Sequence, residues 1–249
     1  MTKFVYVLLR ILLNLNKMRY SKIYEGIFIS RPNRFIANVL IDGVETVCHV
    51  KNTGRCRELL IPGTKVLLEK SDNPNRKTKY DLVKVYKGER LINMDSSAPN
   101  KVFEEFLRTG GLGFIPEHIK AEYSHGDSRF DFYFERDGVK ALAEVKGVTL
   151  EEESVARFPD APTQRGIKHL NGLIDAIKEG YESYAVFIIQ MENIKAFEPA
   201  WDKHHEFGVK LKQAHDAGVK IFAFQCKVTE DELYITENVA INLNKGPQP

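Results

Sequence analysis

The chain has 249 residues, of which 43% are hydrophobic and 28% charged, as expected for a globular protein with a substantial core. The net charge of +2 hides a division. Residues 1–95 carry 18 Lys and Arg against 9 Asp and Glu, whereas the remaining residues carry 18 against 25. This division predicts a basic module that attracts a polyanion, joined to an acidic module that could hold a metal. The alternative is an uneven surface that only serves solubility.

Cysteine usage and the first residues bear on the compartment. The three cysteines show no CxxC spacing, which argues against a zinc site or a disulfide framework and favours a reducing, cytoplasmic compartment. The apolar run over residues 4–15 is interrupted by Arg10 and is shorter than the roughly 20 residues of a membrane span. We therefore expect no membrane partner and interpret residues 1–17 as a dispensable extension. A signal peptide or an interfacial anchor is the alternative.

Residues 18–95 are expected to form a small β-barrel, because short apolar runs alternate with Gly, Pro, Asn and Asp. The expected strands are SKIYEGIFIS (21–30), RFIANVLIDG (34–43), ETVCHV (45–50), GTKVLLEKS (63–71) and KYDLVKVYKG (79–88). A loop with a helical turn between the third and fourth strands favours an OB-like barrel, with an SH3-like barrel as the alternative. The segment SSAPN (96–100) marks the expected domain boundary.

Residues 96–249 mix helices and strands. The expected helices cover 100–111, 163–180 and 204–218, and continuous apolar runs at 183–191 and 219–228 predict strands buried on both faces. Together with an antiparallel hairpin after the first helix, this order predicts a mixed central sheet with helices over its faces. The expected fold class is α+β.

The segment RFDFYFERDGVKALAEVK (129–146) predicts that hairpin, because alternating residues flank an Asp-Gly turn. Pairing Arg136 with Val139 continues until Asp131 lies opposite Glu144, with Lys146 on the same face. Directly opposed carboxylates repel and favour a cation between them. Oxygen ligands suit a hard divalent ion, Mg²⁺ or Mn²⁺. The alternative is an ordinary solvated charge cluster.

Asp131 with Glu144-Val145-Lys146 resembles the PD-(D/E)xK signature of metal-dependent nucleases, although Phe130 stands in place of the proline. The resemblance implies that Asp131, Glu144 and the carbonyl of Val145 hold Mg²⁺, and that Lys146 helps to activate the attacking water. An acidic residue of the preceding helix often completes such sites, and Glu104 and Glu105 are both candidates.

In nucleases of this type the following helix often presents a polar residue to the site. Gln164 is the candidate here, and Lys168 shares its helix face. The neighbouring Arg165 could reach a phosphate. The alternative is a solvated helix start with Thr163 as N-cap.

Four segments together resemble the sugar fermentation stimulation protein A (SfsA) family: KNTGRCRELLIPG (51–63), SRFDFYF (128–134), AEVKGVTL (143–150) and ARFPDAPTQRGIKHL (156–170). The resemblance runs from about Met18 to Leu243. It implies a DNA-binding protein associated with sugar metabolism, with an OB-like N-terminal domain and a nuclease-like C-terminal domain. The candidate DNA contacts in the barrel are Arg31, Arg34, Asn52, Arg55 and Arg57.

Three hypotheses follow from these patterns. The first is a Mg²⁺-dependent nuclease that acts on DNA, with RNA as an alternative substrate. The second is a DNA-binding regulator of sugar metabolism that keeps a nuclease fold without cleaving. The third is a binder of small molecules or oligosaccharides. The intact set of Asp131, Glu144 and Lys146 favours the first. A monomer and a homodimer are both open.

Overall fold

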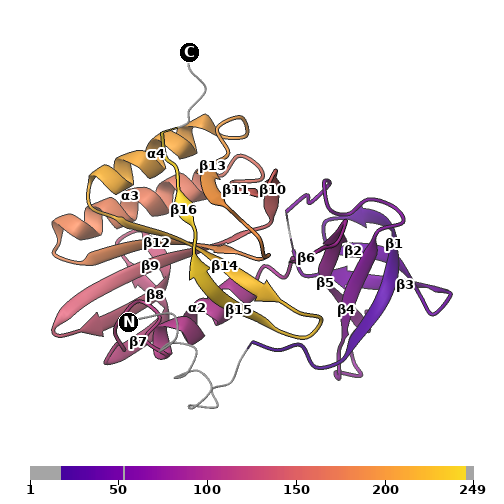
Figure 1. Ribbon diagram of the computed structural model, residues 1–249. Coiled ribbons are helices and arrows are strands. Elements are labelled where there is room, and N and C mark those ends of the chain that lie inside the picture. Colours follow the sequence, from indigo (N-terminus) through magenta and orange to yellow (C-terminus); the bar gives the residue numbers. More distant parts are fainter. Residues whose placement is uncertain (1–17, 53, 245–249) are drawn as a thin grey trace.

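The computed structural model describes residues 18–52 and 54–244. The expected extension at residues 1–17 lies outside them. Within the described ranges, no helix is both long and apolar enough to cross a membrane. Figure 1 shows two bodies side by side, a β-barrel made by the first part of the chain and a helix-covered sheet made by the rest.

The first body is a closed barrel. Its strands are β1 (Ile23–Asn33), β2 (Ile36–Ile41), β3 (Val44–Val50), β4 (Lys65–Lys70), β5 (Tyr80–Lys87) and a short sixth strand, β6 (Arg90–Asn93). The barrel closes because β1 pairs with both β2 and β4, while β3 pairs in parallel with β5. This strand path confirms the OB-like barrel and excludes the SH3-like alternative. The sequence pattern did not predict β6.

The second body is built on a six-stranded sheet in the order β15-β14-β12-β9-β8-β7. Its strands are β7 (His118–His125), β8 (Ser128–Arg136), β9 (Val139–Val148), β12 (Glu182–Ile189), β14 (Lys220–Val228) and β15 (Leu233–Asn238). The central strands β9, β12 and β14 are parallel, and the outer strands pair antiparallel. The predicted mixed sheet and the α+β class are therefore confirmed.

Helices cover both faces of this sheet (Figure 1). They are α2 (Ala98–Arg108), α3 (Gln164–Lys178) and α4 (His205–Asp216). Leu173 of α3 and Leu211 of α4 belong to the same apolar cluster as Leu142 of β9. Phe103 of α2 belongs to the cluster on the other face with Val145. Side chains that alternate along β9 thus meet different helices.

A small second sheet lies beside the ends of β9 and β12. It has the order β10-β11-β13-β16, with β10 (Leu150–Glu152), β11 (Val155–Phe158), β13 (Ala196–Pro199) and β16 (Ala240–Ile241). These strands were not predicted, because two to four residues are too few to show a period.

The two bodies are joined by charged contacts. Lys87 Nζ lies 2.8 Å and Arg90 Nη1 2.7 Å from the carboxylate of Glu151 on β10. Burial alone would raise the pKa of Glu151, but these hydrogen bonds lower it to about 2. Lys84 of β5 donates to the carbonyls of Thr229 and Glu230 at 2.7 and 2.8 Å. The basic excess of the barrel is thus partly used to hold the acidic body.

Candidate active site

The candidate active site begins at the β8–β9 hairpin. The turn residues Asp137 and Gly138 have φ of 50° and 75°, the left-handed pair that a type I′ turn requires. Arg136 pairs with Val139, and the register continues regularly until Phe132 pairs with Ala143. The predicted hairpin, turn and register are therefore confirmed up to this pair.

Beyond that pair the backbone ladder between β8 and β9 ends, and the next contact with β9 is made by the side-chain carboxylate of Asp131. Asp131 accepts hydrogen bonds from the backbone N–H of Val145 and from Asn100 Nδ2, both at 2.8 Å. Burial raises the pKa of Asp131, and the nearby charge of Glu144 raises it further. The predicted direct pairing of Asp131 with Glu144 is not formed, because Asp131 bonds to the backbone of Val145 instead. The charge of Glu144 is nevertheless near enough to raise the pKa of Asp131.

Glu144 is the most buried member of the site, with 4% of its surface exposed. Its Oε1 accepts hydrogen bonds from Lys146 Nζ and His169 Nδ1. Its Oε2 is buried and has no hydrogen-bond partner among the described residues. Burial alone would raise the pKa of Glu144, but the bond from His169 and the charge of Lys146 lower it, so the carboxylate is ionised.

His169 is a site residue that the sequence pattern did not predict. It lies on α3 and is buried, and its Nε2 accepts a 3.4 Å hydrogen bond from Arg165 Nε. The imidazole thus links Arg165 to Glu144 and fixes the orientation of that carboxylate. The signal in the sequence was a single histidine between the apolar residues Ile167 and Leu170, a pattern that usually marks a core histidine.

The predicted residues at the start of α3 lie elsewhere. The side chain of Thr163 caps the helix by accepting from the N–H of Gly166, as the alternative of a solvated helix start expected. Gln164 Nε2 is 3.5 Å from Glu206 on α4. Lys168 is exposed and lines a separate cavity with Asp175. Of the predicted trio, Arg165 is the residue connected to the carboxylates, and its connection runs through His169.

Helix α2 contributes an amide to the site. Its residue in contact with Asp131 is Asn100. Of the two acidic candidates, Glu104 pairs with Arg108 on the same helix, and Glu105 accepts a hydrogen bond from the N–H of Met18 at 3.2 Å. Neither of these contacts involves Asp131 or Glu144.

In the barrel, Arg31 has a structural task. Its guanidinium donates to the carbonyls of Arg34, Asn52, Gly54 and Arg55 at 2.7–2.8 Å. The side chain therefore holds the loop after β3. Both terminal nitrogens of the guanidinium are occupied by the backbone, while Nε has no hydrogen-bond partner among the described residues.

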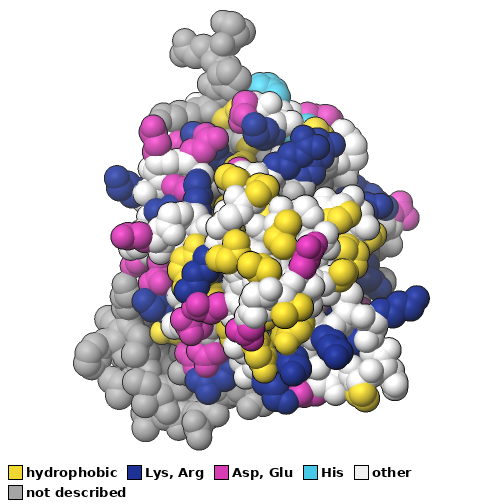
Figure 2. Space-filling model, turned by 90° about the vertical axis from the view of Figure 1, so that its right-hand side faces the viewer, with side chains coloured by type: hydrophobic (Ala, Val, Ile, Leu, Met, Phe, Trp, Pro, Cys, Tyr) yellow, Lys and Arg dark blue, Asp and Glu magenta, His cyan; other side chains and the backbone are white. Residues whose placement is uncertain are grey.

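The other predicted barrel contacts are arranged around Arg31. Arg34, Arg55 and Arg57 are exposed and line a shallow cavity of about 220 Å³. The Arg34 guanidinium lies 5.2 Å from the centroid of Phe35, whose ring is 47% exposed. Asn52 is fixed by donating to the carbonyl of Met94 at 2.8 Å. Figure 2, which views the barrel side, shows basic side chains around a patch of apolar ones.

The donor set suits a hard cation. Across the described ranges, no group of three or more His, Cys, Asp or Glu is arranged as a metal site. A cation here would therefore rest on Asp131, Glu144 and the carbonyl of Val145, with water or substrate oxygens completing its shell. The unpartnered Glu144 Oε2 fits this role, because a buried carboxylate oxygen without a donor is costly unless a cation meets it.

Comparison with known proteins assigns the chain to a protein family. A closed OB barrel followed by a mixed sheet with few helices defines a two-domain α+β protein. The model of the SfsA N-terminal OB domain matches residues 29–94, and the model of the sugar fermentation stimulation protein RE domain matches residues 97–232. The chain belongs to the sugar fermentation stimulation protein (SfsA) family.

Relatives support the assignment over nearly the whole chain. A sugar fermentation stimulation protein homolog of Desulfitobacterium hafniense is 58% identical, covering 92% of this chain and all of the relative. One of Clostridium beijerinckii is 54% identical, covering 91% of this chain and all of the relative. Among solved structures, SfsA of Pyrococcus furiosus in complex with Ca²⁺ is 27% identical with a TM-score of 0.82, covering 92% of this chain and all of that one.

Proposed function

We propose that this protein binds DNA and hydrolyses phosphodiester bonds with Mg²⁺ or Mn²⁺ held by Asp131, Glu144 and the carbonyl of Val145. The observation that carries the proposal is the buried, unpartnered Oε2 of Glu144, an ionised carboxylate beside a second carboxylate. The related Pyrococcus furiosus protein is described in complex with Ca²⁺, and Ca²⁺ and Mg²⁺ both prefer oxygen ligands.

Each residue of the site has a role in this proposal. A bound divalent ion would neutralise phosphate charge and lower the pKa of a bound water. Lys146 is 22% exposed at its side chain, so its ammonium could leave Glu144 for the attacking water or for the charge that develops on the phosphate. His169 and Asn100 are positioning residues, because each holds one carboxylate from a helix.

The barrel would supply most of the affinity for DNA. Arg34, Arg55 and Arg57 are exposed on one side of the loop after β3, where they can contact a phosphate backbone, and Phe35 can stack on a base. Free and buried cysteines are compatible with a reducing, cytoplasmic compartment.

The decisive experiment uses Asp131→Asn, with Asp216→Asn on the surface of α4 as the matched control. Asp131→Asn should lower metal affinity and reduce cleavage of single-stranded, duplex or branched DNA roughly a hundredfold to a thousandfold, while the melting temperature and DNA binding are retained. Calorimetric titration with Mg²⁺ and gel assays with and without metal would measure both.

A regulator of sugar metabolism is the alternative function. It keeps DNA binding and the nuclease fold but has no cleavage step. A wild-type protein that binds DNA but takes up no Mg²⁺ or Mn²⁺ at millimolar concentration would refute the nuclease proposal in favour of this alternative.

A further inference from the structure

A cavity of about 270 Å³ lies where the barrel meets the central sheet. Its walls include Asn52 from the barrel loop, Phe158 from β11 and Gln190 directly after β12. Residues 147–150 at the end of β9 form another wall. Because β9 and β12 are parallel neighbours, the cavity is at the carboxyl ends of the strands, where open α/β sheets bind ligands.

The cavity is adjacent to the carboxylate pair. Gly147 directly follows Lys146, and Pro99 directly precedes the Asn100 that bonds to Asp131. A Cβ atom added to Gly147 would lie 2.8 Å from Pro99 Cγ. The backbone at Gly147 is thus packed too closely against Pro99 for a side chain, and the lining of the cavity begins at the residue next to Lys146.

Gln190 provides an unused hydrogen-bonding group. The residue is 1% exposed, and its Oε1 has no hydrogen-bond partner within the described part of the chain. Its backbone is fixed between the bodies, because its N–H donates to the carbonyl of Val148 at 3.0 Å and its carbonyl accepts from the N–H of Asn93 at 2.9 Å. A buried amide is normally satisfied, so a carboxamide held here without a partner is arranged for a ligand.

An aromatic ring also lines the cavity. Phe158 is half-buried, and its ring packs against Phe187 and Phe207, with centroids 5.5 and 5.2 Å away. The Asn52 side chain in the lining is also fixed, since it donates to the carbonyl of Met94 and accepts from the N–H of Gly54. A rigid ring with a carboxamide nearby suits a flat group that carries both donors and acceptors.

We infer that this cavity binds one unpaired nucleobase of the nucleic-acid strand whose phosphate lies at Asp131 and Glu144. The inference rests on the proposed function. A glutamine carboxamide can pair with the edge of a base through two hydrogen bonds, and unstacked bases stack on aromatic side chains. The volume is below the roughly 300–1,000 Å³ of pockets for drug-sized ligands, so it fits one base rather than a longer segment.

The test moves one abasic residue stepwise along a short single-stranded oligonucleotide. Binding is measured by fluorescence anisotropy with Ca²⁺ as the divalent ion, and gels confirm that the strand stays intact. The wild-type protein should lose about tenfold in affinity at one position, the loss expected for one stacked base. Gln190→Met should show a smaller positional loss, because the hydrogen bonds of the carboxamide are removed while stacking on Phe158 remains, whereas the matched surface variant Gln213→Met should keep the full loss.

Each other outcome overturns the inference. A flat profile in a wild-type protein that binds the intact strand removes the base pocket and leaves the proposed function standing. Failure to bind any nucleic acid removes both. Competition by nucleoside monophosphates at the concentrations at which the oligonucleotide binds would assign the cavity to free nucleotides. Because the abasic scan is made on wild-type protein, it decides the question even if the Gln190 variant is unstable.

Discussion

Half-buried Arg31 and buried Lys84 of the barrel donate to backbone carbonyls. Buried Glu144 of the sheet domain instead accepts from side chains and keeps one oxygen without a partner among the described residues. Arg31 serves four carbonyls of its own loop region, and Lys84 serves the β14–β15 hairpin of the other body. Glu144 Oε2 has no such bond. All three are charged groups with little exposure. Arg31 Nε also has no partner among the described residues, but the other nitrogens of Arg31 are bonded to the backbone, whereas the unpartnered oxygen of Glu144 lies near a second carboxylate.

The contacts of the barrel cations also show that the net charge of residues 1–95 overestimates the charge that is available to bind a polyanion. The basic excess of residues 1–95 predicted a surface for polyanions. Part of that charge faces the acidic body, since Lys87 and Arg90 pair with Glu151. The cations left for a phosphate backbone are fewer than the count suggests. They are concentrated around the loop after β3.

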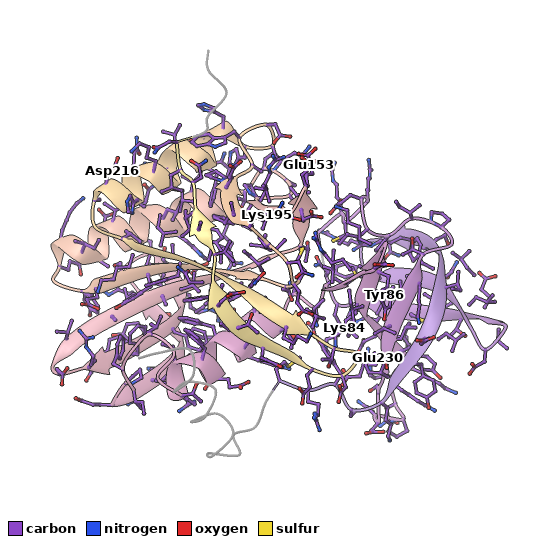
Figure 3. The ribbon with its side chains drawn as sticks, viewed as in Figure 1. Lys84, Tyr86, Glu153, Lys195, Asp216 and Glu230 are labelled. Carbon is purple, nitrogen blue, oxygen red and sulfur yellow. The ribbon has the colours of Figure 1, made fainter. Side chains whose placement is uncertain are left out.

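The largest expected effect concerns Lys146, which contacts Glu144 in the sheet domain. Lys146→Ala should change metal affinity little, because the lysine supplies no ligand atom and the loss of its positive charge, although it raises the pKa of Glu144, also removes repulsion of the cation. Turnover should fall about a hundredfold or more, because the developing charge is then left without its cation. Single-turnover cleavage and calorimetric metal titration separate the two. Lys195→Ala, an exposed lysine labelled in Figure 3, is the control. Equal losses in metal affinity and turnover would contradict this role for Lys146.

The second prediction concerns the histidine that orients Glu144. Because the hydrogen bond from His169 lowers the pKa of Glu144, His169→Asn should raise that pKa and move the pH midpoint of metal binding upward. At neutral pH the affinity for Mg²⁺ should fall about 10–100-fold, as is typical when the partner of a metal ligand is removed, and should partly recover at higher pH. A uniform loss at all pH values would indicate damage to packing instead.

Lys146 and His169 show which site residues can be predicted from the sequence and which cannot. Lys146 was predictable, because alternation and an Asp-Gly turn are local signals that fix the hairpin register. His169 was not, because its contact with Glu144 depends on how α3 packs over the sheet. The strand β7 was not predicted either, because it lies at the sheet edge and its residues are exposed or half-buried, so they show no apolar alternation. The structural role of Arg31 was also unpredictable, since most of its acceptors lie in a loop about 20 residues away.

The third prediction separates the exposed arginines of the barrel, which can contact DNA, from Arg31, which supports the loop. The double variant Arg55→Ala, Arg57→Ala should leave the melting temperature unchanged and weaken DNA binding several-fold. The slope of log affinity against log salt should fall by about 0.9 for each phosphate that the variant no longer neutralises. Arg31→Ala should instead lower the melting temperature, because it removes four hydrogen bonds that hold the loop, two of them part-buried. The distinction between loop support and DNA contact fails if Arg31→Ala is as stable as wild type.

The smallest expected effect concerns the buried lysine at the junction. Lys84 is fully buried beside Glu230 (Figure 3), and burial lowers its pKa from 10.5 to about 8. Below pH 8 the residue is charged in both the folded and the unfolded states, so the full cost of burying the charge is present. Between pH 8 and 10.5 the unfolded state binds more protons than the folded state, so the free energy of unfolding rises with pH.

Relative to Lys84→Met, the wild-type protein should therefore gain about 1 kcal/mol between pH 7 and pH 9, or roughly 2–4 °C in melting temperature. Chemical denaturation of both proteins at several pH values measures the difference, with Lys195→Met as the exposed control. A constant difference from pH 7 to 9 would mean that the three carbonyls around Nζ keep Lys84 charged throughout. The junction would then be an ordinary ion-dipole contact, in contrast to Glu144, whose buried Oε2 has no partner among the described residues.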